Sequence, residues 1–179
     1  MVSKTLELND CSNISIEKLD NFLDLLSRDL KGLISMVNFL ENRKDNCNET
    51  RYNYILGMVH YYIAQCYEDY YYISLKQKGK SHKDNGYLNH LNKAIDCKNP
   101  FAYEAKAKLY FYKKEGEKCR EHFLHFIKYL KEWKKNGLIN EKEYNSYLKE
   151  TEKFIEKNTA GHKNTKINSF TKISLGVIN

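Results

Sequence analysis

Residues 61–77 read YYIAQCYEDYYYISLKQ and hold six tyrosines in seventeen positions. Such a stretch is either an exposed surface that stacks nucleic-acid bases or part of a helical core. Base-stacking platforms place their rings along a basic groove, whereas Glu68 and Asp69, which would repel phosphate, lie among these tyrosines. The tyrosines also recur at steps of three and four, so their rings can fill a core while their hydroxyls reach polar partners at its edge. We therefore predict a central helix over Arg51–Lys76.

Helix breakers are scarce on both sides of this stretch. The 179 residues include one proline, Pro100, and eight glycines. A β-sandwich needs many more turn residues, and 41% hydrophobic with 30% charged residues is typical of a globular chain. We expect an all-α fold of about six helices in antiparallel hairpins, forming a bundle or a short solenoid. The predicted domain covers residues 1–157, with a repeat-like core at 51–134.

Upstream of the tyrosines, Ser15 to about Arg43 is predicted to form one long helix with Ser15 as its N-cap. Its leucines follow the heptad-like spacing of a helix packed alongside another at a shallow angle. The residues of this seam are Leu19, Leu23, Leu26, Leu30, Leu33, Val37 and Leu40.

Downstream, helical periodicity predicts further helices at 87–97, 101–115, about 117–134 and 141–157. Asn99 and Asn140 are the expected N-caps, and Gly116 marks a tight turn. The predicted core of the whole domain consists of Leu26, Leu33, Tyr61, Ala64, Tyr67, Leu109, Phe123, Ile127 and Leu130.

The formal net charge is +7, and the excess of lysine gathers in two places. The loop KQKGKSHKDNG at 76–86 is one, and residues 158–179, predicted to be a flexible basic tail, are the other. Charge runs are most often solvated segments. If this loop binds a partner, Lys78, Lys80 and Lys83 are the candidate residues, and the partner is acidic or is an RNA backbone.

The five cysteines are isolated and odd in number, and none forms a CxxC pair. This pattern favours free thiols in a reducing compartment. No apolar run approaches the length of a membrane span, and no signal peptide is recognised, so a cytoplasmic location is expected. No phosphate-binding loop or nucleophile turn is present, and we predict no cofactor and no metal site.

Residues Arg51 to Leu130 resemble tetratricopeptide-type repeats, which stack pairs of helices through small and aromatic residues. The matching positions are Ala64, Tyr67, Ala94 and Pro100 in one unit, and Ala107, Tyr110, Cys119 and Phe123 in the next. The first helix of the first unit is longer than in that family. The resemblance implies a scaffold that binds a protein or peptide segment on its concave face, without chemistry.

A second, weaker resemblance lies in CREHFLH, where Arg120 and His125 match the R-x4-H spacing of HEPN-type all-α ribonucleases. It implies a metal-independent cut at the RNA 2′-hydroxyl, with His125 moving the proton and Arg120 holding the phosphate. A five-residue step in a regular helix separates two side chains by about 140°. That divergence puts Arg120 at the edge of the core and His125 toward solvent, and argues against a catalytic pair.

The same segment offers Cys119, His122 and His125 as metal ligands. Cys119 and His125, six residues apart, diverge by about 120° around a helix, and Cys119 is required in the core stripe.

We therefore predict a non-enzymatic adaptor that binds a protein or peptide segment in a helical groove. An RNA-binding or RNA-cleaving protein is the alternative.

Overall fold

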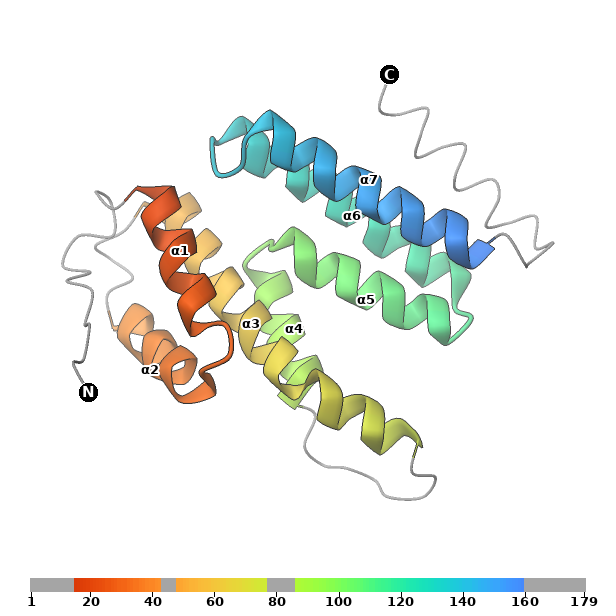
Figure 1. Cartoon of the computed structure of the whole chain (residues 1–179), viewed down its shortest axis with the longest axis horizontal. Coiled ribbons are helices and arrows are strands. Elements are labelled where there is room, and N and C mark those ends of the chain that lie inside the picture. The colour runs from red at the N-terminus through yellow and green to blue at the C-terminus, as the bar shows by residue number, and fades with distance from the viewer. Residues whose placement is uncertain (1–14, 43–47, 77–85, 160–179) are drawn as a thin grey trace. The chain divides into compact units, whose positions relative to one another are not determined.

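A computed structural model describes residues 15–42, 48–76 and 86–159 of the chain (Figure 1). Seven helices and no strand occur within these ranges, which confirms the all-α prediction of helical hairpins. The chain divides after Ala102 into two compact units, each with its own internal contacts. The candidate lysines Lys78, Lys80 and Lys83 and the basic tail lie outside the described residues.

The first unit begins with two short helices where one long helix was predicted. Helix α1 spans Ile16–Leu26 and helix α2 spans Leu30–Glu41. Ser15 caps α1 as expected, since its hydroxyl accepts a hydrogen bond from the Lys18 amide at 3.3 Å. The prediction of a single helix from Ser15 to Arg43 is therefore wrong, although its leucine seam still supplies buried residues to both halves.

The break between α1 and α2 has a local cause at Asp29. Its backbone leaves the helical region, and its carboxylate accepts a hydrogen bond from the Gly32 amide at 3.0 Å, which starts α2. A Cβ atom on Gly32 would lie 2.9 Å from the Leu26 side chain. A glycine at this position lets Leu26 and the Asp29 cap lie over the first turn of α2.

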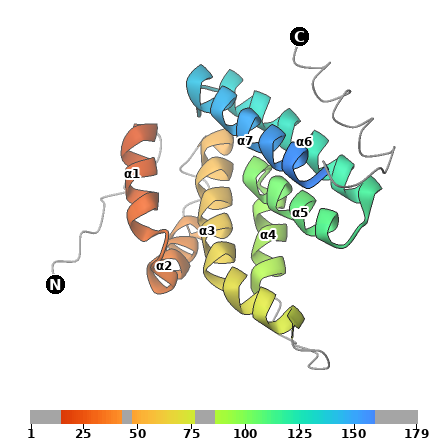
Figure 2. The ribbon, with the colours of Figure 1, turned by 45° about the vertical axis from the view of Figure 1, so that its right-hand side comes forward.

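Helices α3 (Glu49–Lys76) and α4 (Gly86–Asp96) form an antiparallel hairpin, and α2 packs against α3 (Figure 2). The predicted central helix is confirmed. The hairpin contains small residues at buried positions: Ala64 of α3 and Ala94 of α4 are fully buried, and Gly57 of α3 lies against Cys97. Without large side chains at these points, the two helix backbones approach closely.

Tyrosines of α3 contribute to the core and to its edge. Tyr52 and Tyr54 are buried, and the Tyr54 hydroxyl donates a hydrogen bond to Asp20 of α1. Tyr61 and Tyr67, both predicted to be in the core, are only half-buried. Those two predictions are wrong because these rings lie at the rim of the hairpin, where each contacts another ring.

The second unit contains most of α5 (Pro100–Tyr112) together with α6 (Gly116–Lys135) and α7 (Glu141–Thr159). Asn99, which closes the first unit, caps α5 as predicted, its side-chain oxygen accepting from the Ala102 amide at 3.2 Å. The turn between α5 and α6 is made by Lys114, which adopts a left-handed φ of 60°. Gly116 is the first residue of α6 and has no positive φ, so the turn lies two residues before the predicted position.

The core of the second unit lies along one stripe of α6, as its spacing predicted. The buried residues of α6 are Cys119, Phe123, Phe126, Leu130 and Trp133. Helix α7 adds Ile155 and Phe154 against Phe123, and α5 adds Ala107. This arrangement leaves the neighbouring flank of α6 to face α5.

Five of the nine predicted core residues are buried, namely Leu33, Ala64, Leu109, Phe123 and Leu130. Besides Tyr61 and Tyr67, Leu26 and Ile127 are only half-buried and were wrongly assigned. Leu26 is the last residue of α1, at the break that the single-helix prediction omitted. Ile127 lies on the flank of α6 next to the buried stripe, about 80° from Cys119.

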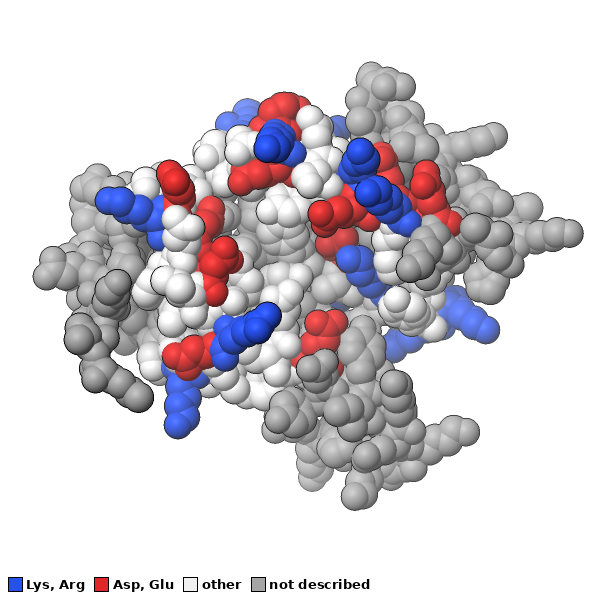
Figure 3. Space-filling model, viewed as in Figure 1, with Lys and Arg blue, Asp and Glu red and all other residues white. Residues whose placement is uncertain are grey.

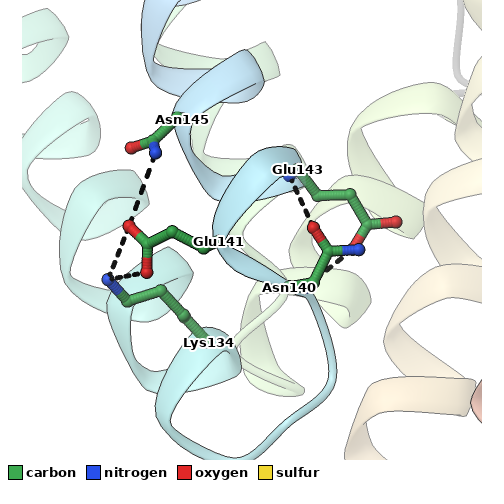
Figure 4. A network of polar contacts seen from close by, with 5 residues as sticks. All are labelled: Lys134, Asn140, Glu141, Glu143 and Asn145. Atoms are coloured by element: carbon green, nitrogen blue, oxygen red, sulfur yellow. Dashed lines mark hydrogen bonds and ion pairs between the residues drawn. The ribbon is translucent and has the colours of Figure 1, made fainter.

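Asn140 and Glu143 form a reciprocal capping pair at the start of α7 (Figure 4). The Asn140 side-chain oxygen accepts from the Glu143 amide at 3.0 Å, and the Glu143 carboxylate accepts from the Asn140 amide at 2.7 Å. Beside it, Lys134 of α6 forms an ion pair with Glu141 of α7 at 3.0 Å. These contacts join the end of α6 to the start of α7.

Cys66, Cys97 and Cys119 are free thiols, as predicted for these three. Cys11 and Cys47 lie outside the described residues. Within the described ranges, none of the helices combines the length and the apolar character that crossing a bilayer requires.

Candidate functional site

Five rings from two helices form a continuous series of ring contacts in the second unit. Tyr103 and Tyr110 come from α5, and His122, His125 and Tyr129 come from α6. All five side chains are half-buried. We call this set the aromatic ladder.

Tyr103 is the central ring of the aromatic ladder. Its centroid lies 5.1 Å from that of His125 and 5.2 Å from that of Tyr129, with interplanar angles of 29° and 26°. The His122 ring lies 6.0 Å from Tyr103 and 5.0 Å from Tyr110, and is tilted against both. These separations fall in the range of favourable aromatic pairs, so the rings hold one another in place.

Helical spacing explains why these residues meet. Steps of three and four residues place side chains on one side of a helix, and His122, His125 and Tyr129 follow this spacing on α6. On α5, Tyr103 and Tyr110 are seven residues apart and so share a side. Since the stripe through Phe123 faces the core, the ladder residues of α6 lie on the flank beside it.

The His122 ring has a defined protonation state. Its Nδ1 atom lies 2.9 Å from the backbone oxygen of Lys118, one turn earlier. Because a carbonyl oxygen only accepts, Nδ1 carries the proton and donates it, which leaves Nε2 as the acceptor. Burial is the main cause that lowers the pKa of His122 below its ordinary value, which favours the neutral ring.

Lysines flank the aromatic ladder. The Lys118 ammonium lies 5.4 Å from the centre of the Tyr110 ring and also pairs with Glu115 at 2.6 Å, while the Lys128 ammonium lies 5.0 Å from the centre of Tyr129. Lys106 and Glu121 act on His122 with opposite sign. The flank is therefore aromatic with a mixed charged border, in which lysine is the more frequent charge.

Arg120 and His125 are separated by the geometry of α6. The helix is continuous from Gly116 to Lys135, so the five-residue step keeps its divergence of about 140°. Arg120 is exposed, and the structure records no hydrogen bond between it and His125. His125, expected to point to solvent, is instead half-buried and stacked on Tyr103 and Tyr129. The expectation that His125 is solvated is wrong because Tyr103 of α5 and Tyr129 of α6 pack against its ring.

Cys119 belongs to the buried core of the second unit. It is buried in the cluster with Ala107 and Phe123, and burial raises the pKa of its thiol to about 11. Throughout the part of the chain that the structure describes, no group of three or more histidine, cysteine or acidic side chains could hold a metal ion.

Charge on the described surface is mixed. On the face drawn in Figure 3, blue and red side chains alternate among the described residues, and neither sign forms a continuous patch. Most of the excess positive charge of the chain belongs to residues outside the described ranges. The basic-loop hypothesis for Lys78, Lys80 and Lys83 therefore stays a prediction.

No protein-family model matches the chain, and neither a curated protein nor a solved structure matches it significantly.

Sequence reasoning identified the histidines of the ladder but not the ladder itself. His122 and His125 were considered only as metal ligands or catalytic groups, and Tyr110 only as a repeat position. The signal in the sequence that could have indicated the ladder was the spacing of His122, His125 and Tyr129, together with two tyrosines seven residues apart in the preceding helix. What the spacing could not show was that these two flanks face each other.

Proposed function

We propose that this protein is a non-enzymatic helical scaffold and that the aromatic ladder is the surface with which it binds a segment of another protein. The observation that carries the proposal is the series of contacts among five half-buried rings of α5 and α6, three of which are stacked. The resemblance to helical repeats noted in the sequence agrees with a binding role, and three unpaired thiols agree with a reducing, cytoplasmic location.

Stacked rings suit a contact surface for two physical reasons. Tyrosine presents a large, partly apolar area with few rotatable bonds, so ordering it on binding costs little entropy. In the aromatic ladder much of that ordering is already achieved, because Tyr103 packs against both His125 and Tyr129, at 5.1 and 5.2 Å, and those two rings also contact each other. A partner would then gain contact area against a preorganised surface.

The charged border favours an acidic segment. Lys106, Lys118 and Lys128 adjoin the rings and outnumber the two carboxylates there, Glu121 and the Glu115 partner of Lys118. Carboxylates of the partner can approach these ammonium groups, and the attraction weakens with salt, because exposed charges are screened over about 8–10 Å.

Single-stranded RNA is the second candidate, since the same rings offer faces on which bases can stack. The carboxylates of Glu115 and Glu121 beside the ladder disfavour RNA, which carries a phosphate at every nucleotide, whereas a peptide can place its fewer carboxylates next to the lysines alone. For this reason we place the protein segment first.

A selection from a displayed random-peptide library, followed by affinity measurements on the full chain, tests the proposal. We expect enriched peptides to be acidic and to contain aromatic residues. The double variant His125→Ala/Tyr129→Ala should weaken their binding by at least about tenfold. The matched control Arg120→Ala/Leu124→Ala changes the opposite flank of the same helix and should change affinity less than about twofold.

A fluorescent mixed-sequence RNA 20-mer serves as the competing probe in the same assay. Failure to enrich any peptide, or equal loss of affinity in both double variants, overturns the proposal. Tight RNA binding that disappears only in His125→Ala/Tyr129→Ala would assign the aromatic ladder to nucleic acid instead.

A further inference from the structure

Two histidines meet in the first unit, away from the aromatic ladder. His60 of α3 is 3% exposed, and its Nδ1 atom lies 3.1 Å from Nδ1 of His90 on α4. His90 is half-buried, and the ring of Tyr67 stacks on it at 6.2 Å. The contact therefore links α3 to α4 across the hairpin.

The two imidazole rings point their nitrogens at each other. The ring centroids are 5.2 Å apart, and the Nδ1 atoms are 3.1 Å apart. The difference is close to the width of one imidazole ring, which means that both nitrogens lie near the line joining the centroids. This is the geometry of a direct N–H···N hydrogen bond. Two lone pairs converging on a shared metal ion would instead bring the centroids closer together at the same nitrogen separation.

Such a contact needs one proton between the two nitrogens. With two protons the N–H groups would oppose each other, and with none the lone pairs would. In the neutral pair, one ring is therefore the Nδ1–H tautomer, which donates, and the other is the Nε2–H tautomer, which accepts. This requirement couples the protonation of His60 to that of His90.

We propose that the hydrogen bond between His60 and His90, which we call the latch, joins α3 to α4 through one shared proton at neutral pH. In acid each of the two Nδ1 atoms carries its own proton, and the latch opens. Opening removes the hydrogen bond and replaces it with two like charges in a buried contact. The free-energy cost of the positive charge is largest at His60, the more buried of the two rings.

The surroundings of the latch do not compensate a positive charge. Lys93 of α4 acts on both histidines and opposes protonation. Tyr67 of α3 contacts the His90 ring, and Cys97, the residue after α4, lies against Gly57 of α3 and has the pKa of its buried thiol raised to about 11, mainly by burial. Glu68 belongs to α3 and lies one helical turn after Ala64. Helix α2 also packs on α3, and its only charged residues, Lys31 and Glu41, are exposed.

The direction of the pH effect follows from these contacts. Burial first, then His90 and Lys93, lowers the pKa of His60 from 6.5 to about 4, and burial also lowers that of His90. As the pH falls below 6.5, His60 binds a proton in the unfolded chain but stays unprotonated in the folded chain. Stability is therefore fully present above 6.5 and is lost progressively toward pH 4.

Imidazole ¹⁵N spectra of the full chain test the tautomers directly. At pH 7.5 we expect one of the two rings to carry its proton on Nδ1 and the other on Nε2, with assignments from His60→Asn and His90→Asn. Two Nε2–H rings would overturn the proposal. A stoichiometric change of both rings on adding Zn²⁺ alone would also overturn it and would assign a metal site.

Urea unfolding at pH 7.5 and 5.0 tests the consequence. The pKa values of 6.5 and about 4 predict that His60 alone raises the unfolding equilibrium constant by about 30-fold over this interval. Asparagine places an amide near the Nδ1 position without titrating, so His60→Asn should remove about that factor, and His125→Asn should retain the wild-type response. If His60→Asn does not fold, His90→Asn provides the comparison. Parallel pH dependence in the wild type and in both latch variants would overturn the latch.

Discussion

Gly57 of α3 lies directly against Asn99, whose Cβ atom would be 3.2 Å from a Cβ atom placed on Gly57. The Cβ atom of Cys97 would be 3.1 Å away on the same side. Both neighbours are attached directly to the backbone, so neither can move aside by rotating a side chain. The close approach of α3 to the segment that joins α4 to α5 therefore depends on the absence of a side chain at Gly57.

Gly57→Ala should destabilise the protein by about 1–3 kcal/mol, because the free-energy cost of overpacking the contact exceeds the gain from the higher helix propensity of alanine. Gly116→Ala is the matched control, since a Cβ atom there would meet nothing within 4 Å. The control should be neutral or stabilising by about 0.5–1 kcal/mol. Equal free energies of unfolding for the two variants in urea would show that the α3–α4 hairpin accommodates the added methyl group without losing stability.

Lys114→Gly should stabilise the protein by about 1 kcal/mol. Lys114 has a φ of 60°, and the Glu115 amide bonds back to the Tyr110 carbonyl at 2.9 Å, so the residue forms the left-handed cap of α5. A non-glycine residue in this region bears steric strain that glycine does not. Lys113→Gly, one residue earlier, should give no gain. A lower thermal midpoint for Lys114→Gly than for the wild type would contradict this account of the turn.

Asn140→Ala should cost about 1 kcal/mol of unfolding free energy, because it leaves the Glu143 amide without its capping acceptor (Figure 4). Glu141→Ala removes the neighbouring ion pair with Lys134, which is exposed on the Glu141 side, and should cost at most about 0.5 kcal/mol. Chemical denaturation of both variants measures the difference. The reverse order of the two effects would show that the ion pair, and not the cap, holds the start of α7.

Phe123→Ala and Leu130→Ala should each destabilise the protein by about 2–5 kcal/mol, since both side chains are buried in the second unit. Leu124→Ala, on the 41% exposed neighbour of Phe123, should change stability by less than about 0.5 kcal/mol. The readout is the urea midpoint at constant slope. Unchanged midpoints for both buried variants would mean that the stripe does not form the core.

Arg120 and His125 are not expected to cleave RNA, because they diverge around α6 and the His125 ring packs against Tyr103 and Tyr129. Purified protein incubated with mixed single-stranded RNA should leave it intact on a denaturing gel. Cleavage that disappears in His125→Ala while the circular dichroism spectrum is unchanged would restore the ribonuclease hypothesis.

Local signals in the sequence were sufficient to predict most of the helices. The caps at Ser15, Asn99 and Asn140 were predicted correctly because a capping side chain bonds to an amide three residues away, which involves no other part of the chain. The core stripe of α6 through Phe123 and Leu130 was also correct, since apolar residues at steps of three and four define one face of a helix whatever packs on it.

The break at Asp29 was also encoded locally, but two local signals conflicted there. The leucine seam favoured a continuous helix, while the Asp29 cap and Gly32 favoured a new one, and the packing of Leu26 over the first turn of α2 accompanies the second outcome. The sequence contained both signals without showing which of them prevails.

Contacts between helices were decided by the tertiary structure alone. The stack of Tyr103 on His125 and the contact of His60 with His90 join residues on different helices, 22 and 30 positions apart in the sequence. Whether two such rings meet depends on how each helix is rotated about its axis and how far apart the axes lie. Periodicity along one helix determines which residues share a face, whereas the packing of small residues such as Gly57 and Ala94 determines which face it meets.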